Sequence, residues 1–115
     1  MANPVVWFEV MGRNGEGLRS FYSDLFGWRF DVDEKINYGM VEATGGQGIP
    51  GGVGGGDRQH VTFYVSTPSI NASLDAVTQR GGKVVMPRTE LPGGTILGMF
   101  TDPEGNAVGL VEEAA

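Results

Sequence analysis

The sequence contains no cysteine, a single histidine, and only eight lysine or arginine residues against fourteen aspartates and glutamates. Without cysteine there is no disulfide framework, no thiolate nucleophile and no zinc–sulfur site. The formal charge of -6 and the scattered basic residues argue against phosphate-rich partners, since these require a basic stripe. We therefore expect neither a nucleic-acid partner nor a membrane partner.

Long apolar runs are also absent from the sequence. No run approaches the roughly 20 residues of a membrane span. The N-terminal residues MANPVVWFEV lack the charged and apolar regions of a signal peptide. These absences predict a soluble, cytoplasmic protein. A length of 115 residues, 40% of them hydrophobic, predicts a single domain over residues 1–115 with a modest core.

The first half of the chain follows the order strand, helix and three strands. Residues 5–11, rich in β-branched and aromatic side chains, predict a strand. Asn14 predicts the N-cap of a helix that runs to Phe26, and Gly27 predicts its end. The apolar face of this helix consists of Leu18, Phe21, Tyr22 and Leu25. Further strands are predicted at residues 28–33, 38–43 and 49–53, the last within a glycine-rich stretch.

The same order begins again at His60. Residues 60–65 predict a strand, Thr67 and Pro68 predict the start of a helix, and Gly81–Gly82 predict its end. Strands follow at residues 83–87, 95–101 and 107–112. The repeat predicts two βαβββ modules in tandem, at residues 4–56 and 57–115. Two such modules side by side would form an α+β fold, in which a curved mixed sheet makes a cup for a small molecule.

The alternation of side chains along a strand indicates which residues line this cup. Val6, Phe8 and Val10 are uniformly apolar and suit the side that faces the helix. The residues that alternate with these on the first strand face the other way, as do the corresponding residues of the strand predicted at 60–65. They include the candidate ligand-binding residues Trp7, Glu9, His60, Thr62 and Tyr64. Trp7 and Tyr64 would supply an aromatic wall, while the others would supply orienting polar groups.

Glu9 lies in mid-strand among apolar residues, where an unpaired carboxylate is costly. We therefore expect the Glu9 carboxylate to have a charged or hydrogen-bonding partner, to face the cavity, or to lie near a solvent-exposed edge of the sheet. A partner such as Arg13, Arg88 or His60 would give it a structural role. If Glu9 and His60 instead share one cavity, they are candidates for a general acid–base pair.

Two sequence runs carry a family resemblance: FYSDLFGW at residues 21–28 and FTDPEGNAVGLVEE at residues 100–113. They resemble the two halves of a vicinal oxygen chelate domain, the superfamily of glyoxalase I, bleomycin-resistance proteins and extradiol dioxygenases. The resemblance covers nearly the whole chain. It implies the paired βαβββ fold, a homodimer and often a divalent metal held in the cup.

The metal ligands that the resemblance implies are His, Gln or Glu side chains on the first, fourth, fifth and eighth strands. In this sequence those positions fall on Trp7, residues 49–53, His60 and Gly109. Only His60 carries a donor atom, and a divalent ion needs several. We therefore expect no metal and no other cofactor.

These observations predict a metal-free small-molecule binding protein of the glyoxalase/bleomycin-resistance type that holds a flat apolar or aromatic ligand, neutral or cationic. The alternative is an enzyme of the same superfamily. It would be a divalent-metal-dependent lyase, isomerase or dioxygenase with other ligands, or a metal-free acid–base catalyst that uses Glu9 and His60. A third possibility is an interaction domain whose aromatic face forms a dimer.

Overall fold

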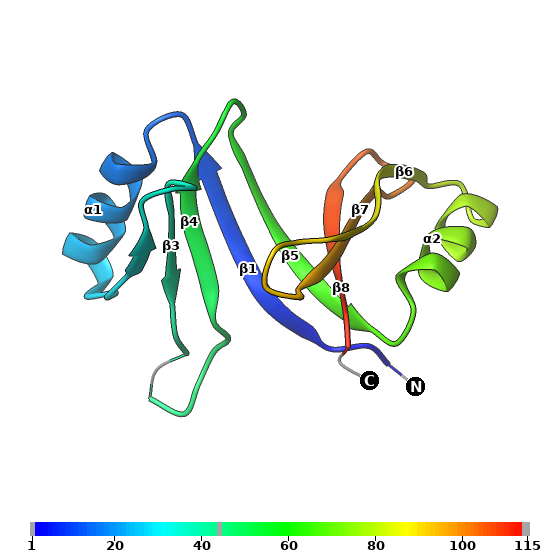
Figure 1. Ribbon diagram of the computed structural model, residues 1–115, viewed down its shortest axis with the longest axis horizontal. Coiled ribbons are helices and arrows are strands. Elements are labelled where there is room, and N and C mark those ends of the chain that lie inside the picture. The colour runs from blue at the N-terminus through cyan, green and yellow to red at the C-terminus, as the bar shows by residue number, and fades with distance from the viewer. Residues whose placement is uncertain (1, 44, 114–115) are drawn as a thin grey trace. The chain divides into compact units, whose positions relative to one another are not determined.

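The computed structural model describes residues 2–43 and 45–113 (Figure 1). The chain divides into an N-terminal unit, Trp7–Thr62, and a C-terminal unit, Phe63–Ala115 together with Met1–Val6. In chain order the elements are β1 (Val5–Gly12), α1 (Gly15–Phe26), β2 (Asp31–Asp33), β3 (Tyr38–Val41), β4 (Gly51–Gly55), β5 (His60–Thr67), α2 (Ile70–Gln79), β6 (Lys83–Glu90), β7 (Ile96–Thr101) and β8 (Ala107–Glu112). Over the described residues, neither helix has the length and apolar character needed to cross a bilayer.

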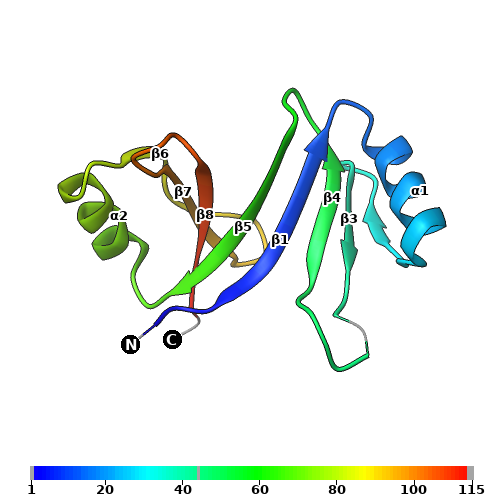
Figure 2. The same ribbon diagram turned by 180° about the vertical axis from the view of Figure 1, so that it is seen from behind.

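In each half of the chain the elements follow the order strand, helix and three strands that the repeat predicts. In the N-terminal unit the order is β2-β3-β4-β1, with β1 and β4 parallel and the other pairs antiparallel. Figure 1 and Figure 2 show β4 between β3 and β1 from opposite sides. In the C-terminal unit the order is β5-β8-β7-β6, again with one parallel pair, β5 with β8. The α+β class and the repeated βαβββ order are thus confirmed.

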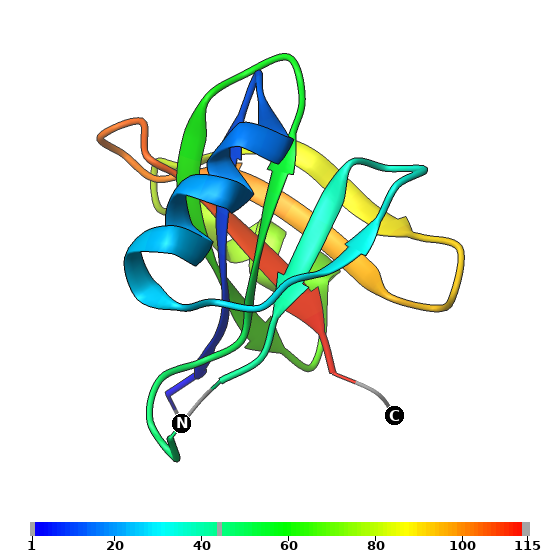
Figure 3. The ribbon, with the colours of Figure 1, turned by 90° about the vertical axis from the view of Figure 1, so that its left-hand side faces the viewer.

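Helix α1 begins and ends at the predicted residues. The Asn14 side chain accepts a hydrogen bond of 2.9 Å from the backbone N–H of Gly17, which satisfies one of the free donors of the first turn. At the other end Gly27 has a φ of 74°, a left-handed conformation that glycine adopts without strain. Figure 3 shows α1 in front of the strands of its unit.

Arg19, on α1, is buried with 8% of its surface exposed. Its guanidinium donates to the carbonyl oxygens of Val53 at 3.1 Å and Asn37 at 3.3 Å, and to Asn37 Oδ1 at 2.9 Å. Its aliphatic stem passes over Gly39, where a Cβ would lie only 2.5 Å from Arg19 Cδ. We call this arrangement the Arg19 clamp, because it ties α1 to β4 and to the turn before β3.

Residues 28–30 differ from the prediction, because the strand predicted at residues 28–33 is limited to Asp31–Asp33. The Trp28 ring packs 5.4 Å from each of the rings of Phe8, Tyr22 and Phe26, centroid to centroid. Packing of this ring against α1 and β1 determines the path of the chain after Gly27 more than strand propensity does.

Helix α2 begins two residues later than predicted. Its N-cap is Ser69, whose side chain accepts from the N–H of Ala72 at 3.1 Å. Thr67, the predicted cap, ends β5, and its hydroxyl accepts from the N–H of Ser69 at 3.3 Å. The prediction was wrong because Thr67 and Ser69 are both good caps, and β5 extends through Thr67.

The described residues of the C-terminal unit include a small apolar core and an ion pair between Arg88 and Glu112. The core consists of Ile70, Leu74 and Leu110, packed against Val65, Ile96 and Phe100. At the end of β8, Glu112 accepts from Arg88 Nη2 at 2.7 Å and from the backbone N–H of Ile70 at 3.0 Å. The bonds from Arg88, followed by that from Ile70, hold the pKa of Glu112 below its ordinary value.

Candidate functional site

Four side chains of the N-terminal unit form a continuous hydrogen-bonded series, which we call the Glu9 network: Trp7, Tyr38, Glu9 and His60. The indole N–H of Trp7 donates to Tyr38 Oη at 3.0 Å, and the Tyr38 hydroxyl donates to Glu9 Oε1 at 3.0 Å. His60 Nε2 lies 3.1 Å from Glu9 Oε2. Of the partners considered for Glu9, the structure thus brings His60 to its carboxylate.

The pairing with Glu9 determines the chemistry of the imidazole. A carboxylate oxygen only accepts, so Nε2 of His60 carries the hydrogen in this bond. In the neutral ring Nδ1 is then the basic nitrogen. The Glu9 side chain is 13% exposed and that of His60 is 32% exposed, so the imidazole is the more accessible of the two. The pair therefore suits a role in which Glu9 orients and His60 meets solvent or a ligand.

The glycine-rich strand β4 makes room for this network. Glu9 on β1 and Met40 on β3 are both in register with Gly52, and Tyr38 is in register with Gly54. A Cβ at Gly52 would overlap the Tyr38 ring and hydroxyl. Because β4 has no side chain at this position, Tyr38 reaches across the strand from β3 to the carboxylate on β1.

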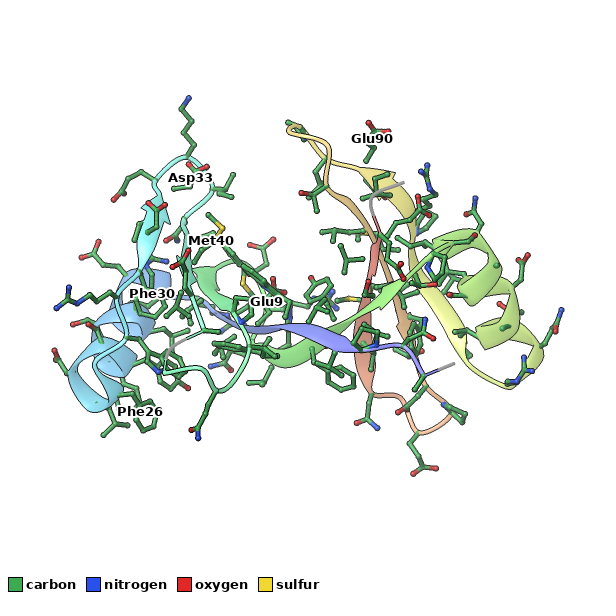
Figure 4. All side chains as sticks on the ribbon, turned by 90° about the horizontal axis from the view of Figure 1, so that it is seen from below. Glu9, Phe26, Phe30, Asp33, Met40 and Glu90 are labelled. Carbon is green, nitrogen blue, oxygen red and sulfur yellow. The ribbon has the colours of Figure 1, made fainter. Side chains whose placement is uncertain are left out.

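The alternation predicted for β1 agrees with the contacts. Figure 4 labels Glu9 and Met40, which lie on the face of their sheet away from α1. Phe8, the next residue along β1, packs on the opposite side against Trp28. Trp7 and Glu9 therefore share the face of the N-terminal unit that its helix leaves uncovered.

The other two candidate residues, Thr62 and Tyr64, are buried, with 5% and 7% of their surfaces exposed. Tyr64 is in register with Gly109 on β8, and a Cβ at Gly109 would overlap the Tyr64 ring. In the N-terminal unit the Tyr38 ring covers Gly52 on β4, the strand that pairs in parallel with β1. In the C-terminal unit the Tyr64 ring covers Gly109 on β8, the strand that pairs in parallel with β5.

Two pockets open on the N-terminal unit. The first, which we call the Trp7 pocket, has a volume of about 450 Å³. It is lined by Trp7, Arg29, Phe30, Asp31, Met40, Val41, Glu42 and Pro50. The second, the Arg13 pocket, has a volume of about 730 Å³ and is lined by Val10, Met11, Gly12, Arg13, Asn14, Gly17, Leu18, Phe21, Gln59, His60 and Val61. The Glu9 network connects them, since Trp7 borders one and His60 the other.

Tyr38 was not among the candidate residues from the sequence, although it joins Trp7 to Glu9. One signal was available, because Tyr38 and Met40 alternate in a predicted strand that precedes the glycine-rich one. The sequence does not show which glycine the ring covers, since this depends on the register of β3 with β4.

The metal that the family resemblance implies does not fit the N-terminal unit. The indole N–H of Trp7 offers no lone pair to a metal and is bonded to Tyr38. On β4 the Tyr38 ring occupies the space in which a side chain at Gly52 would begin. His60 supplies one imidazole, and Nε2 of this ring is bonded to Glu9.

The position on the eighth strand is equally closed, since the Tyr64 ring covers Gly109. Within residues 2–43 and 45–113 there is no group of three His, Asp or Glu side chains that could hold a metal ion. A catalytic zinc needs about three protein ligands. The described residues are therefore not suited to a divalent ion.

Sequence comparison places this chain among known proteins. The family model described as Glyoxalase/Bleomycin resistance protein/Dioxygenase superfamily matches residues 5–110. A Mycobacterium bovis protein named "Putative glyoxylase CFP32" is 27% identical over 113 residues, which cover 90% of this chain and 43% of that protein. The chain thus spans less than half the length of this relative.

Solved structures show the same fold. A superfamily member from Vibrio splendidus 12B01 superposes with a TM-score of 0.69 at 14% identity, covering 97% of this chain and 100% of the other. A methylmalonyl-CoA epimerase in complex with methylmalonyl-CoA and NH4+ gives a TM-score of 0.68 at 14% identity, covering 100% and 97%. At this identity the likeness is one of fold alone. With the family match over residues 5–110, the chain belongs to the glyoxalase/bleomycin resistance protein/dioxygenase superfamily.

Proposed function

We propose that this protein binds a small apolar or aromatic molecule at Trp7 without a metal or other cofactor. The observation that carries the proposal is the Trp7 pocket. Its volume of about 450 Å³ lies within the range of small-molecule sites, roughly 300–1,000 Å³. Five of its lining residues are apolar or aromatic: Trp7, Phe30, Met40, Val41 and Pro50. Such a lining, with a few polar groups, favours a flat apolar ligand.

The charged groups of this pocket favour a neutral or cationic ligand. Asp31 and Glu42 contribute two carboxylates against the single guanidinium of Arg29. The bond from Trp7 to Tyr38 fixes one edge of the indole, which holds the ring in place as a platform. An aromatic face attracts a cation that lies over it.

Fluorescence of Trp7 tests this proposal. In a Trp28→Phe variant, where Trp7 is the only tryptophan, titration with benzyltrimethylammonium is expected to quench or shift the emission. Toluenesulfonate, an aromatic anion, is expected to bind about fivefold more weakly because it meets two carboxylates. The matched Trp7→Phe variant, which keeps Trp28, should show no change. An equal change in Trp7→Phe, or no change with any neutral or cationic aromatic compound, would refute the proposal.

A second function, acid–base catalysis, is favoured by one observation, the 3.1 Å contact of Glu9 with His60. Here His60 would take a proton through Nδ1, while Glu9 fixes the tautomer and stabilises the imidazolium. A carbon acid next to a carbonyl would lose its hydrogen and keep the electron pair as an enolate. Return of a solvent proton would complete the cycle.

Hydrogen exchange in D₂O tests the catalytic alternative. On this alternative, a 2-substituted acyl thioester such as methylmalonyl-CoA exchanges its carbon-bound hydrogen faster with the protein than without it. Glu9→Gln should slow the exchange about 100-fold, because positioned acid–base groups contribute about 10² or more. Glu104→Gln, in an exposed turn, is the control. Exchange at the protein-free rate would exclude this function for that substrate class and leave the binding function.

We also propose that the protein is a cytoplasmic homodimer with neither a nucleic-acid nor a membrane partner. Support for a dimer comes from the end of α1, where Leu25 and Phe26 are each more than half exposed, at 58% and 58%. Contiguous exposed apolar side chains are typical of interaction surfaces. The net charge of -6 disfavours anionic polymers and surfaces.

A further inference from the structure

The Arg13 pocket differs from the Trp7 pocket in charge. Its titratable lining residues are Arg13 and His60, and no aspartate or glutamate is among the residues that line it. This is unexpected in a chain with fourteen acidic and eight basic residues. The pocket therefore offers a locally positive surface on an acidic protein, which favours an anionic ligand.

The wall of the Arg13 pocket is apolar. Val10 from β1, Leu18 and Phe21 from α1, and Val61 from β5 line it together. Phe21 is 57% exposed and Val61 is 75% exposed, so both present apolar surface to an incoming molecule. Burial of this surface would favour binding of an apolar group. The pocket thus pairs an apolar wall with the cationic side chain of Arg13.

We propose that the Arg13 pocket is a second binding site, for small organic carboxylates with an apolar or aromatic body. The Arg13 guanidinium is exposed and planar, and it can donate two parallel hydrogen bonds to a carboxylate. Phe21 and Leu18 cover the apolar body. His60 lines the same pocket, and its bond to Glu9 fixes the position of the ring.

This site is distinct from the site proposed at Trp7. The two pockets have no lining residue in common, and their charges favour ligands of opposite sign. A failure of one binding proposal can therefore be distinguished from a failure of the other with two ligands, one cationic and one anionic.

Calorimetric titration with phenylacetate tests the second site. A ligand of this size is expected to bind with a dissociation constant of about 1 mM. Arg13→Gln should weaken binding about fivefold or more, because it removes the charged donor. Arg58→Gln, which removes the same charge from an exposed residue that does not line the pocket, should leave the affinity unchanged. Arg13 is exposed, so its replacement is not expected to alter the fold, and circular dichroism checks this.

Two further measurements complete the test. Phe21→Ala should weaken phenylacetate binding, and 2-phenylethylamine, of similar size but cationic, should bind at least fivefold more weakly. The proposal is overturned if phenylacetate does not bind at 10 mM (about ten times the expected constant), if Arg13→Gln binds it equally well, or if the amine binds as tightly.

Discussion

Replacement of Arg19 by methionine is expected to lower the free energy of unfolding by about 3 kcal/mol. Methionine keeps most of the aliphatic stem over Gly39 but removes the three hydrogen bonds of the Arg19 clamp. The carbonyl oxygens of Val53 and Asn37 then lose a charged donor in a region that α1 shields from water. Each buried polar group that loses its partner costs about 1–3 kcal/mol. Urea unfolding measures the effect as a lower midpoint.

The control for Arg19→Met is Arg13→Met, which removes the same charge from an exposed position in the bend before α1. An exposed substitution of this kind is expected to change stability by no more than about 0.5 kcal/mol. Arg19→Lys should fall between the two, because one ammonium cannot reach all three acceptors. If Arg19→Met and Arg13→Met unfold at the same urea concentration, the clamp does not stabilise the fold.

Much of the fold could be predicted because the signals are local. Asn14 and Gly27 mark the two ends of α1, and each acts through a hydrogen bond or a backbone angle of its own. The repeated order of elements follows in the same way from periodicity. Local signals fail where two of them compete, as at Thr67 and Ser69, or where packing decides, as at Trp28.

In the candidate site, too, some residues could be predicted from local sequence signals and others could not. Alternation along β1 was enough to select Trp7 and Glu9, and the position of His60 at the start of a strand brought it into the set. The contact of Tyr38 with Glu9 could not be predicted, because it depends on the registers of β3 and β1 with β4. The glycine-rich stretch gave no sign that Gly52 lies beneath the Tyr38 ring.

The glycine beneath that ring gives the second large effect, and Gly52→Ala is expected to destabilise the protein by about 2 kcal/mol. The added methyl group would overlap the Tyr38 ring, so the ring must move. Its bonds to Trp7 and Glu9 would then be lost or lengthened. We expect a lower urea midpoint and a change in the fluorescence of Trp7, whose indole N–H loses its acceptor.

Gly56→Ala is the matched control, since a Cβ at Gly56 would meet Met11 Cε at 3.6 Å, an ordinary contact. It adds the same methyl group to the same glycine-rich stretch and should have an effect below about 0.5 kcal/mol. Similar losses in both variants would mean that these glycines are needed for a shared backbone conformation. The Tyr38 ring would then not be the cause.

A double variant separates the ring from the backbone directly. If Gly52→Ala acts through overlap with Tyr38, it should cost less in a Tyr38→Ala background, where the space above β4 is empty. The two changes would then be non-additive by about 1–2 kcal/mol, as expected for residues in contact. Additive effects would show that Gly52 is needed for the backbone of β4 and not for the Tyr38 ring. The claim that this ring closes the fourth-strand position to a metal ligand would then lose its support.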